Sequence, residues 1–123
     1  MVNLKPQILQ LLKTIEEAKQ VSFFYPEEWS DNKLPAISYY EAQNSTDIKT
    51  MDGVEHTSNI VFIFDIWAKN PGKNSTIAVE LDKKLQGLGF TRELSIDLYE
   101  TATKIHHKSM RYRAIVDEFE QIL

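Results

Sequence analysis

The stretch NIVFIFDIWAKN, residues 59–70, decides the fold. Successive side chains of a β-strand point to opposite faces of a sheet, so its alternate residues form two sets. The first set is wholly apolar and comprises Ile60, Phe62, Phe64, Ile66 and Ala68. The second set comprises Val61, Ile63, Asp65 and Trp67. An antiparallel sheet in a small domain usually shows one face to water. The second set therefore raises the question of what covers it.

Length and composition favour one soluble domain over residues 1–123. The chain has no cysteine, which excludes a disulfide framework, a thiol nucleophile and a cysteine-ligated zinc site. The first 20 residues lack the apolar core and cleavage site of a signal peptide, and no apolar run reaches the ~20 residues of a membrane span. We therefore expect an intracellular protein without a membrane partner.

Apolar spacing of 3.6 residues predicts a first helix over residues 5–19, with Pro6 in its first turn. A second helix is predicted to be capped by Asn74 or Ser75 and to end at Gly87 and Gly89. Alternation and turn residues predict five extended segments. These segments are residues 21–26, 36–43, 57–68, 90–100 and 103–119.

The predicted fold class is α+β, in the order α-β-β-β-α-β-β, with a mostly antiparallel sheet of four to five strands. Two helices can cover only one face of such a sheet. Residues of about 44–56 are polar and carry an Asp-Gly turn signal, so they form either a tight hairpin or a mobile loop. Their number favours the mobile loop.

The apolar residues Val61, Ile63 and Trp67 then need a cover other than the helices. One candidate is a loop of the same chain, carrying Trp29, and the other is a second copy, because a bare apolar patch marks an interaction site. We therefore assign these three residues to a subunit or partner interface.

Charge is uneven along the chain. Residues 104–113 contain four cations and no acid, so this segment is +4 and the rest of a chain of net charge −4 is −8. A basic strand is typical either of a sheet edge protected by charge or of a polar contact face. We assign Lys108, Arg111 and Arg113 to the candidate interface on the second interpretation. Neighbouring tyrosines would suit base stacking, but no nucleic-acid motif accompanies them.

Residues with catalytic chemistry form no recognisable motif. His106 and His107 are adjacent, so on a strand they face opposite ways and cannot ligate one metal together. His56 could approach one of them across strands. The sequence lacks the spacing of a metalloprotease helix, a nucleophile elbow and a phosphate-binding loop. We expect no catalytic residue, metal or cofactor.

Four short motifs follow one another in a distinctive order. They are Asp65-Ile66-Trp67, Gly89-Phe90-Thr91-Arg92, Leu98-Tyr99-Glu100, and His107-Lys108 followed by Arg111-Tyr112. Together they resemble the tail completion (tail terminator, head-to-tail joining) proteins of long-tailed bacteriophages and of prophages in Gram-positive bacteria. The resemblance spans about residues 5–117. It departs at His106, where the family pattern has an aromatic residue, and an exposed strand position tolerates either.

The resemblance implies a structural protein of the virion, assembled in the host cytoplasm. It would close as a hexameric ring on the finished tail tube and offer a surface to the head connector. DNA would pass through the ring without specific binding. The resemblance also implies a mobile loop between the second and third strands. The alternative, from the residues alone, is a small α+β binding module that pairs sheets face to face as a dimer.

Overall fold

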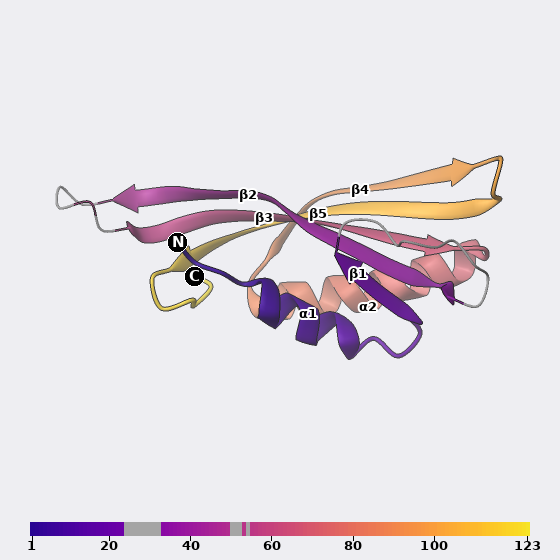
Figure 1. The fold of residues 1–123 in the computed structure, drawn as a ribbon, viewed down its shortest axis with the longest axis horizontal. Coiled ribbons are helices and arrows are strands. Elements are labelled where there is room, and N and C mark those ends of the chain that lie inside the picture. The colour runs from indigo at the N-terminus through magenta and orange to yellow at the C-terminus, as the bar shows by residue number, and fades with distance from the viewer. Residues whose placement is uncertain (24–32, 50–52, 54) are drawn as a thin grey trace.

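The computed structural model describes residues 1–23, 33–49, 53 and 55–123. Within them the chain is α+β, as predicted, with two helices and a five-stranded sheet (Figure 1). The elements in chain order are α1 (Lys5–Lys13), β1 (Gln20–Phe23), β2 (Ala36–Lys49), β3 (Glu55–Ala68), α2 (Pro71–Leu88), β4 (Thr91–Glu100) and β5 (Ile105–Asp117).

The order of the strands across the sheet differs from their order in the chain, and is β1-β2-β3-β5-β4. The sheet is mixed, so the prediction of an antiparallel sheet is wrong for β1, which pairs parallel with β2 from Gln20 opposite Ala36. A parallel pair needs a connection of about a dozen residues to bring the chain back to the same end. The segment 24–35 has that length. The other three pairings are antiparallel.

Two predicted boundaries are corrected. The first helix ends at Lys13 instead of residue 19, and the Thr14 hydroxyl donates to the Leu11 carbonyl at 2.6 Å, a side-chain bond that competes with further helical bonds. The prediction of a mobile loop over residues 44–56 is wrong for residues 44–49, 55 and 56, which belong to the antiparallel strands β2 and β3, with Lys49 opposite Glu55. Residues 50–52 and 54 lie outside the described residues.

Helix α2 has caps at both ends. Its N-cap is Asn70, not Asn74 or Ser75, and the Asn70 side chain accepts from the Gly72 N–H at 2.7 Å. Pro71 follows at the first helical position, where its missing N–H costs nothing. The predicted C-terminus is confirmed, because Gly89 is the C-cap with φ of 108°, a left-handed conformation that favours glycine.

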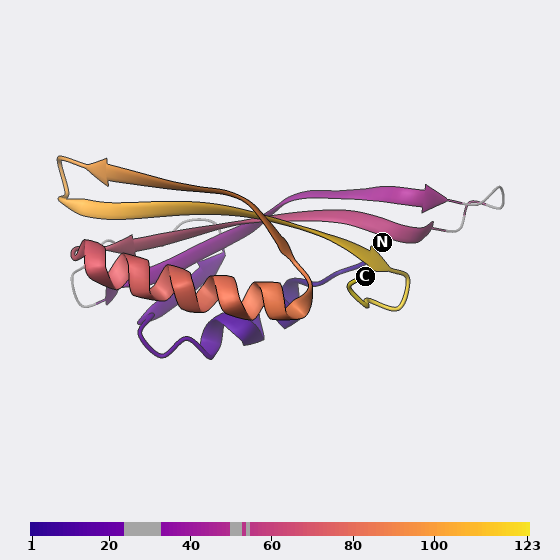
Figure 2. The same cartoon turned by 180° about the vertical axis from the view of Figure 1, so that it is seen from behind.

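Both helices lie against the same face of the sheet, and Figure 2 shows this from behind. Strands β3 and β4 are both antiparallel to β5, so they run parallel to each other with β5 between them and α2 as the connection. This is a split β-α-β unit. The core between sheet and helices is centred on the first set of the opening stretch and includes Ile8, Leu12, Phe62, Phe64, Leu81, Leu85 and Tyr112.

The basic strand β5 is internal, between β3 and β4, so its interpretation as a charged sheet edge is wrong. Its predicted alternation is confirmed, since Met110, Tyr112, Ala114 and Val116 are buried in the core. Strand β4 forms one edge of the sheet, and all ten of its residues are exposed.

Candidate functional site

We call the sheet face opposite α1 and α2 the open face. The candidate interface residues Val61 and Trp67 lie on it, yet they are 0% and 2% exposed within the single chain. Ile63, between Tyr40 of β2 and Arg111 of β5 in the pairing register, is half-buried. A second copy is therefore not needed to bury Val61 and Trp67.

Trp67 is held by polar neighbours as well as by apolar ones. Its indole Nε1 donates to the Ser38 hydroxyl at 2.9 Å, and its ring stacks on His107 with centroids 3.7 Å apart at 15°. The imidazole Nε2 of His107 lies 2.7 Å from Asp65 Oδ1. The other buried members of this cluster are Leu34, Ala36 and Ile105. Trp29, the predicted cover, lies outside the described residues.

The cations of β5 on the open face are paired within the fold. Arg111 Nε and Arg113 Nε donate to the two oxygens of Glu93 at 3.0 and 2.9 Å, and Arg113 Nη1 donates to Asn59 at 2.6 Å. The hydrogen bonds from Arg113 and then Arg111 lower the pKa of Glu93. Because Arg113 lies opposite Val61 in the register, its long side chain belongs to the cover of the open face.

Lys108 is separated from these two arginines. It lies on the helix side of β5, and its ammonium is 2.7 Å from Asp97 of β4. The six candidate interface residues therefore do not form one surface: Val61 and Trp67 are buried, Ile63 is half-buried, and Lys108 faces away from Arg111 and Arg113.

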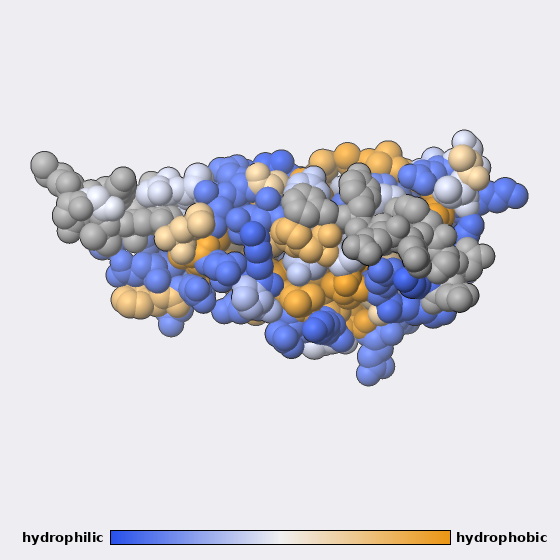
Figure 3. Space-filling model, in the orientation of Figure 1, coloured by the Kyte–Doolittle hydropathy of each residue, from blue (hydrophilic) through white to orange (hydrophobic). Residues whose placement is uncertain are grey.

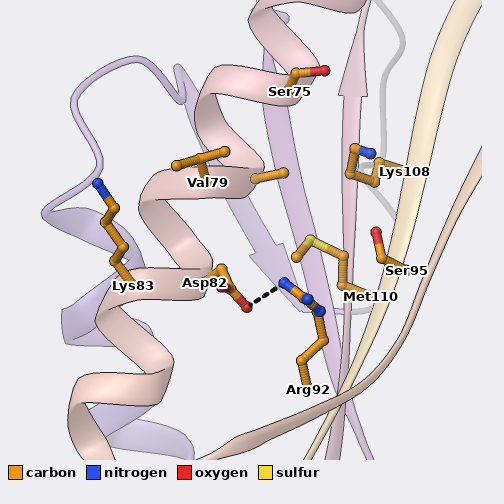
Figure 4. Close-up of a pocket in the computed structure, with 9 residues that line it drawn as sticks. Ser75, Val79, Asp82, Lys83, Arg92, Ser95, Lys108 and Met110 are labelled. Carbon is orange, nitrogen blue, oxygen red and sulfur yellow. Dashed lines mark ion pairs between the residues drawn. The ribbon is translucent and has the colours of Figure 1, made fainter.

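A groove of about 340 Å³ lies between α2 and the β4–β5 hairpin (Figure 4). Ala78, Val79 and Met110 supply its apolar lining, and Asp82 points towards Arg92 across it, with Oδ1 and Nη1 3.0 Å apart. The hydroxyl of Tyr112 donates to the same Asp82 oxygen at 2.6 Å. Asp82, Arg92 and Tyr112 therefore satisfy one another, and the rest of the polar lining is Ser75, Lys83, Ser95 and Lys108.

Two pKa values are shifted by this network. Burial alone would raise the pKa of Asp82, but hydrogen bonds from Tyr112 and Gln86 and the ion pair with Arg92 outweigh it, and the pKa is lowered. Burial first, and then the bond to Asp82, raise the pKa of Tyr112 well above its ordinary range. Asp82 is therefore an anion and Tyr112 a neutral donor at neutral pH.

The three histidines lie apart. His56 Nδ1 is 3.4 Å from Glu118 Oε2, His106 contacts the ring of Tyr99, and His107 binds Asp65. The predicted approach of His56 to another histidine is not seen. Across the part of the chain that the structure describes, no three histidine, aspartate or glutamate side chains gather as a metal site would require. No described helix is long and apolar enough to cross a membrane.

A surface that the sequence interpretation missed is the apolar stripe of β4. Leu94, Ile96 and Leu98 are 48%, 42% and 50% exposed and alternate along the open face. Apolar side chains gather along the sheet edge where β4 lies (Figure 3). The signal was present in the alternation of the segment ELSIDLYE, which predicted a strand but not which strand would be at the edge.

Comparison with protein-family models and with curated protein sequences finds no match to this chain.

Proposed function

We propose that this chain is a structural virion protein of the tail completion class. In this role it caps the finished tail tube of a long-tailed phage as a six-membered ring and joins the tube to the DNA-filled head. Its partners are further copies, the tail tube protein and the head connector, and it has no catalytic step.

The observation that carries the proposal is that the residues of the four resembling motifs contact one another. Asp65 and Trp67 of the first motif both contact His107 of the last. Arg92 of the second motif meets Tyr112 of the last through their shared partner Asp82, and Leu98 of the third motif pairs with His107 of the last in the β4–β5 register. The motifs therefore describe one connected frame across β3, β5 and β4, and not four isolated matches.

The state of the polar groups also supports a structural role. Asp82 and Arg92 of the α2–β4 groove, and Arg111 and Arg113 on the open face, are bonded to partners within the fold. A catalytic site needs a group positioned to act on a substrate, and such groups usually combine a pocket with an available acid, base or nucleophile. An acidic body would also repel the DNA that passes through a ring.

The test is electron microscopy of purified chain mixed with tail tubes from the phage or prophage that carries it, prepared without their own terminator. We expect density with six-fold symmetry at one end of each tube and an arrest of further tube growth. Binding along the tube sides, or no binding to tubes, would overturn the proposal.

A charge-swapped variant tests the contact between the basic strand and the head connector. Reversing only Arg111 and Arg113 would place two acids beside Glu93, so the variant combines Glu93→Arg, Arg111→Glu and Arg113→Glu. It keeps the opposite-charge pairs and reverses the sign of the patch. We expect a folded protein by circular dichroism that still caps tubes but joins heads at least 10-fold less efficiently, on the order of 1.4 kcal/mol. Normal joining would contradict this contact.

A further inference from the structure

Strand β4 is a long sheet edge with little protection against pairing. It has ten residues and no partner on its outer side among the described strands. Natural sheet edges are usually shortened, or carry lysine or proline, because their free N–H and C=O groups accept another strand. The β4 sequence contains neither lysine nor proline, only one of its four charged residues, Asp97, lies between Leu94 and Leu98, and its single irregularity lies at its start, between Arg92 and Leu94.

The opposite side of the sheet differs from β4. Its edge strand β1 has four residues, and the part of β2 beyond it runs through a largely polar sequence. Among the described strands, β4 is thus the edge that is long enough to add a strand along a row of apolar side chains, namely Leu94, Ile96 and Leu98.

We propose that a second copy of this chain docks on this edge, with the two β4 strands antiparallel and a two-fold axis through Ile96. The two five-stranded sheets join into one continuous sheet, with both pairs of helices on the same side. Such an isologous contact uses the same residues from both copies. The proposal concerns the free chain and does not rest on the proposed function.

The register is selected by which side chains it brings together. Symmetric antiparallel strands must be centred on one residue, which then faces its own copy. Centring on Ile96 places Leu94 opposite Leu98 of the second copy, and the two-fold axis repeats this pair on the other side of Ile96. It also places Ser95 opposite Asp97, where the hydroxyl can donate to the carboxylate. Opposed apolar pairs stabilise a sheet, whereas like charges directly opposite destabilise it.

The neighbouring registers are less favourable. Centring on Ser95 places Glu93 opposite Asp97 of the second copy, which opposes two acids. Centring on Asp97 places that carboxylate opposite itself and Leu94 opposite Glu100. Only the register at Ile96 pairs all three stripe residues with apolar residues and opposes no like charges between Leu94 and Leu98.

The first experiment is light scattering behind size-exclusion chromatography over a tenfold range of concentration. We expect a mass of two subunits for the natural chain and one subunit for Ile96→Lys, with unchanged circular dichroism. Val79→Lys is the matched control, because Val79 is 55% exposed on α2 and should leave the dimer intact. A natural chain that is monomeric throughout, or an oligomer that survives Ile96→Lys, would overturn the proposal.

The second experiment tests the register and uses the absence of cysteine from the chain. In Ile96→Cys the two thiols face each other across the axis, where directly opposite Cα atoms lie about 4.5–5.5 Å apart, within the range of a disulfide. We expect a covalent dimer on mild oxidation of Ile96→Cys and none with Val79→Cys. Faster cross-linking of Ser95→Cys would overturn the assigned register.

The outcomes separate this inference from the proposed function. If Ile96→Lys dissociates the dimer and the natural chain does not bind tail tubes, the inference holds and the proposed function is wrong. If the chain caps tubes but is monomeric in free solution, the proposed function holds and the inference is wrong.

Discussion

Truncation of Trp67 to alanine is expected to lower the free energy of unfolding by about 3–5 kcal/mol. The indole is 2% exposed, stacks on His107 and donates to Ser38, so the substitution removes buried area and leaves two polar groups with fewer partners. Urea unfolding followed by circular dichroism measures the change, because tryptophan fluorescence would itself be altered by the substitution.

A matched control separates burial in the monomer from a role at an interface. Val79 is 55% exposed on α2 and lies outside the proposed β4 contact, so Val79→Ala should change the unfolding free energy by less than about 0.5 kcal/mol. If Trp67→Ala left stability unchanged and altered only assembly, Trp67 would be a partner anchor and our account of the open face would be wrong.

The second large effect is expected at Asp82. In Asp82→Ala the buried Tyr112 hydroxyl and Arg92 lose their shared acceptor, and a buried donor without a partner costs about 1–3 kcal/mol. We expect a loss of that size at pH 7, measured as a lower urea midpoint with an unchanged slope. A loss below about 0.5 kcal/mol would contradict the importance of this network.

The same substitution should change the acid dependence of stability. The pKa of Asp82 is lowered in the folded state, so its contribution is present above the unfolded value, about 3.9, and is lost as the pH falls through the folded value. The natural chain should therefore lose stability below about pH 4, and Asp82→Ala should lose less of it. Glu93→Gln is the comparison, because it removes a different carboxylate whose pKa is also lowered. Equal losses in the natural chain and Asp82→Ala between pH 7 and pH 3 would count against this linkage.

Local sequence patterns predicted the helices and strands well, because apolar alternation and capping residues act within a few positions of the chain. The alternation of residues 60–68 and of Met110 to Val116 located two central strands and their core faces, and Gly89 ended α2. The sequence did not predict the early end of α1 or the parallel pairing of β1. The hydroxyl bond at Thr14 and the pairing of Gln20 with Ala36 do not change the spacing of apolar residues along the chain.

The candidate site was harder to predict, because it depends on which strands become neighbours. The sequence shows four cations in residues 104–113, but not that Glu93 lies between Arg111 and Arg113. It shows Trp67 on a second apolar face, but not that His107 stacks on it. The edge position of β4 follows from the insertion of β5 between β3 and β4, which no local pattern encodes.

The split β-α-β unit also bears on how the chain folds. The β2–β3 and β4–β5 hairpins join strands that are consecutive in the chain. Strands β3 and β5 also pair, but α2 and β4 separate them in the sequence. Pairing of distant segments pays the larger loop-closure entropy, so we expect the two hairpins to form first and their docking along β3 and β5 to limit the rate. Because the β3–β5 contacts are then being made in the transition state, Ile60→Val and Ala114→Gly, which lie opposite each other in this seam, should slow refolding. Faster unfolding with unchanged refolding in both would mean that the seam forms only after the rate-limiting step.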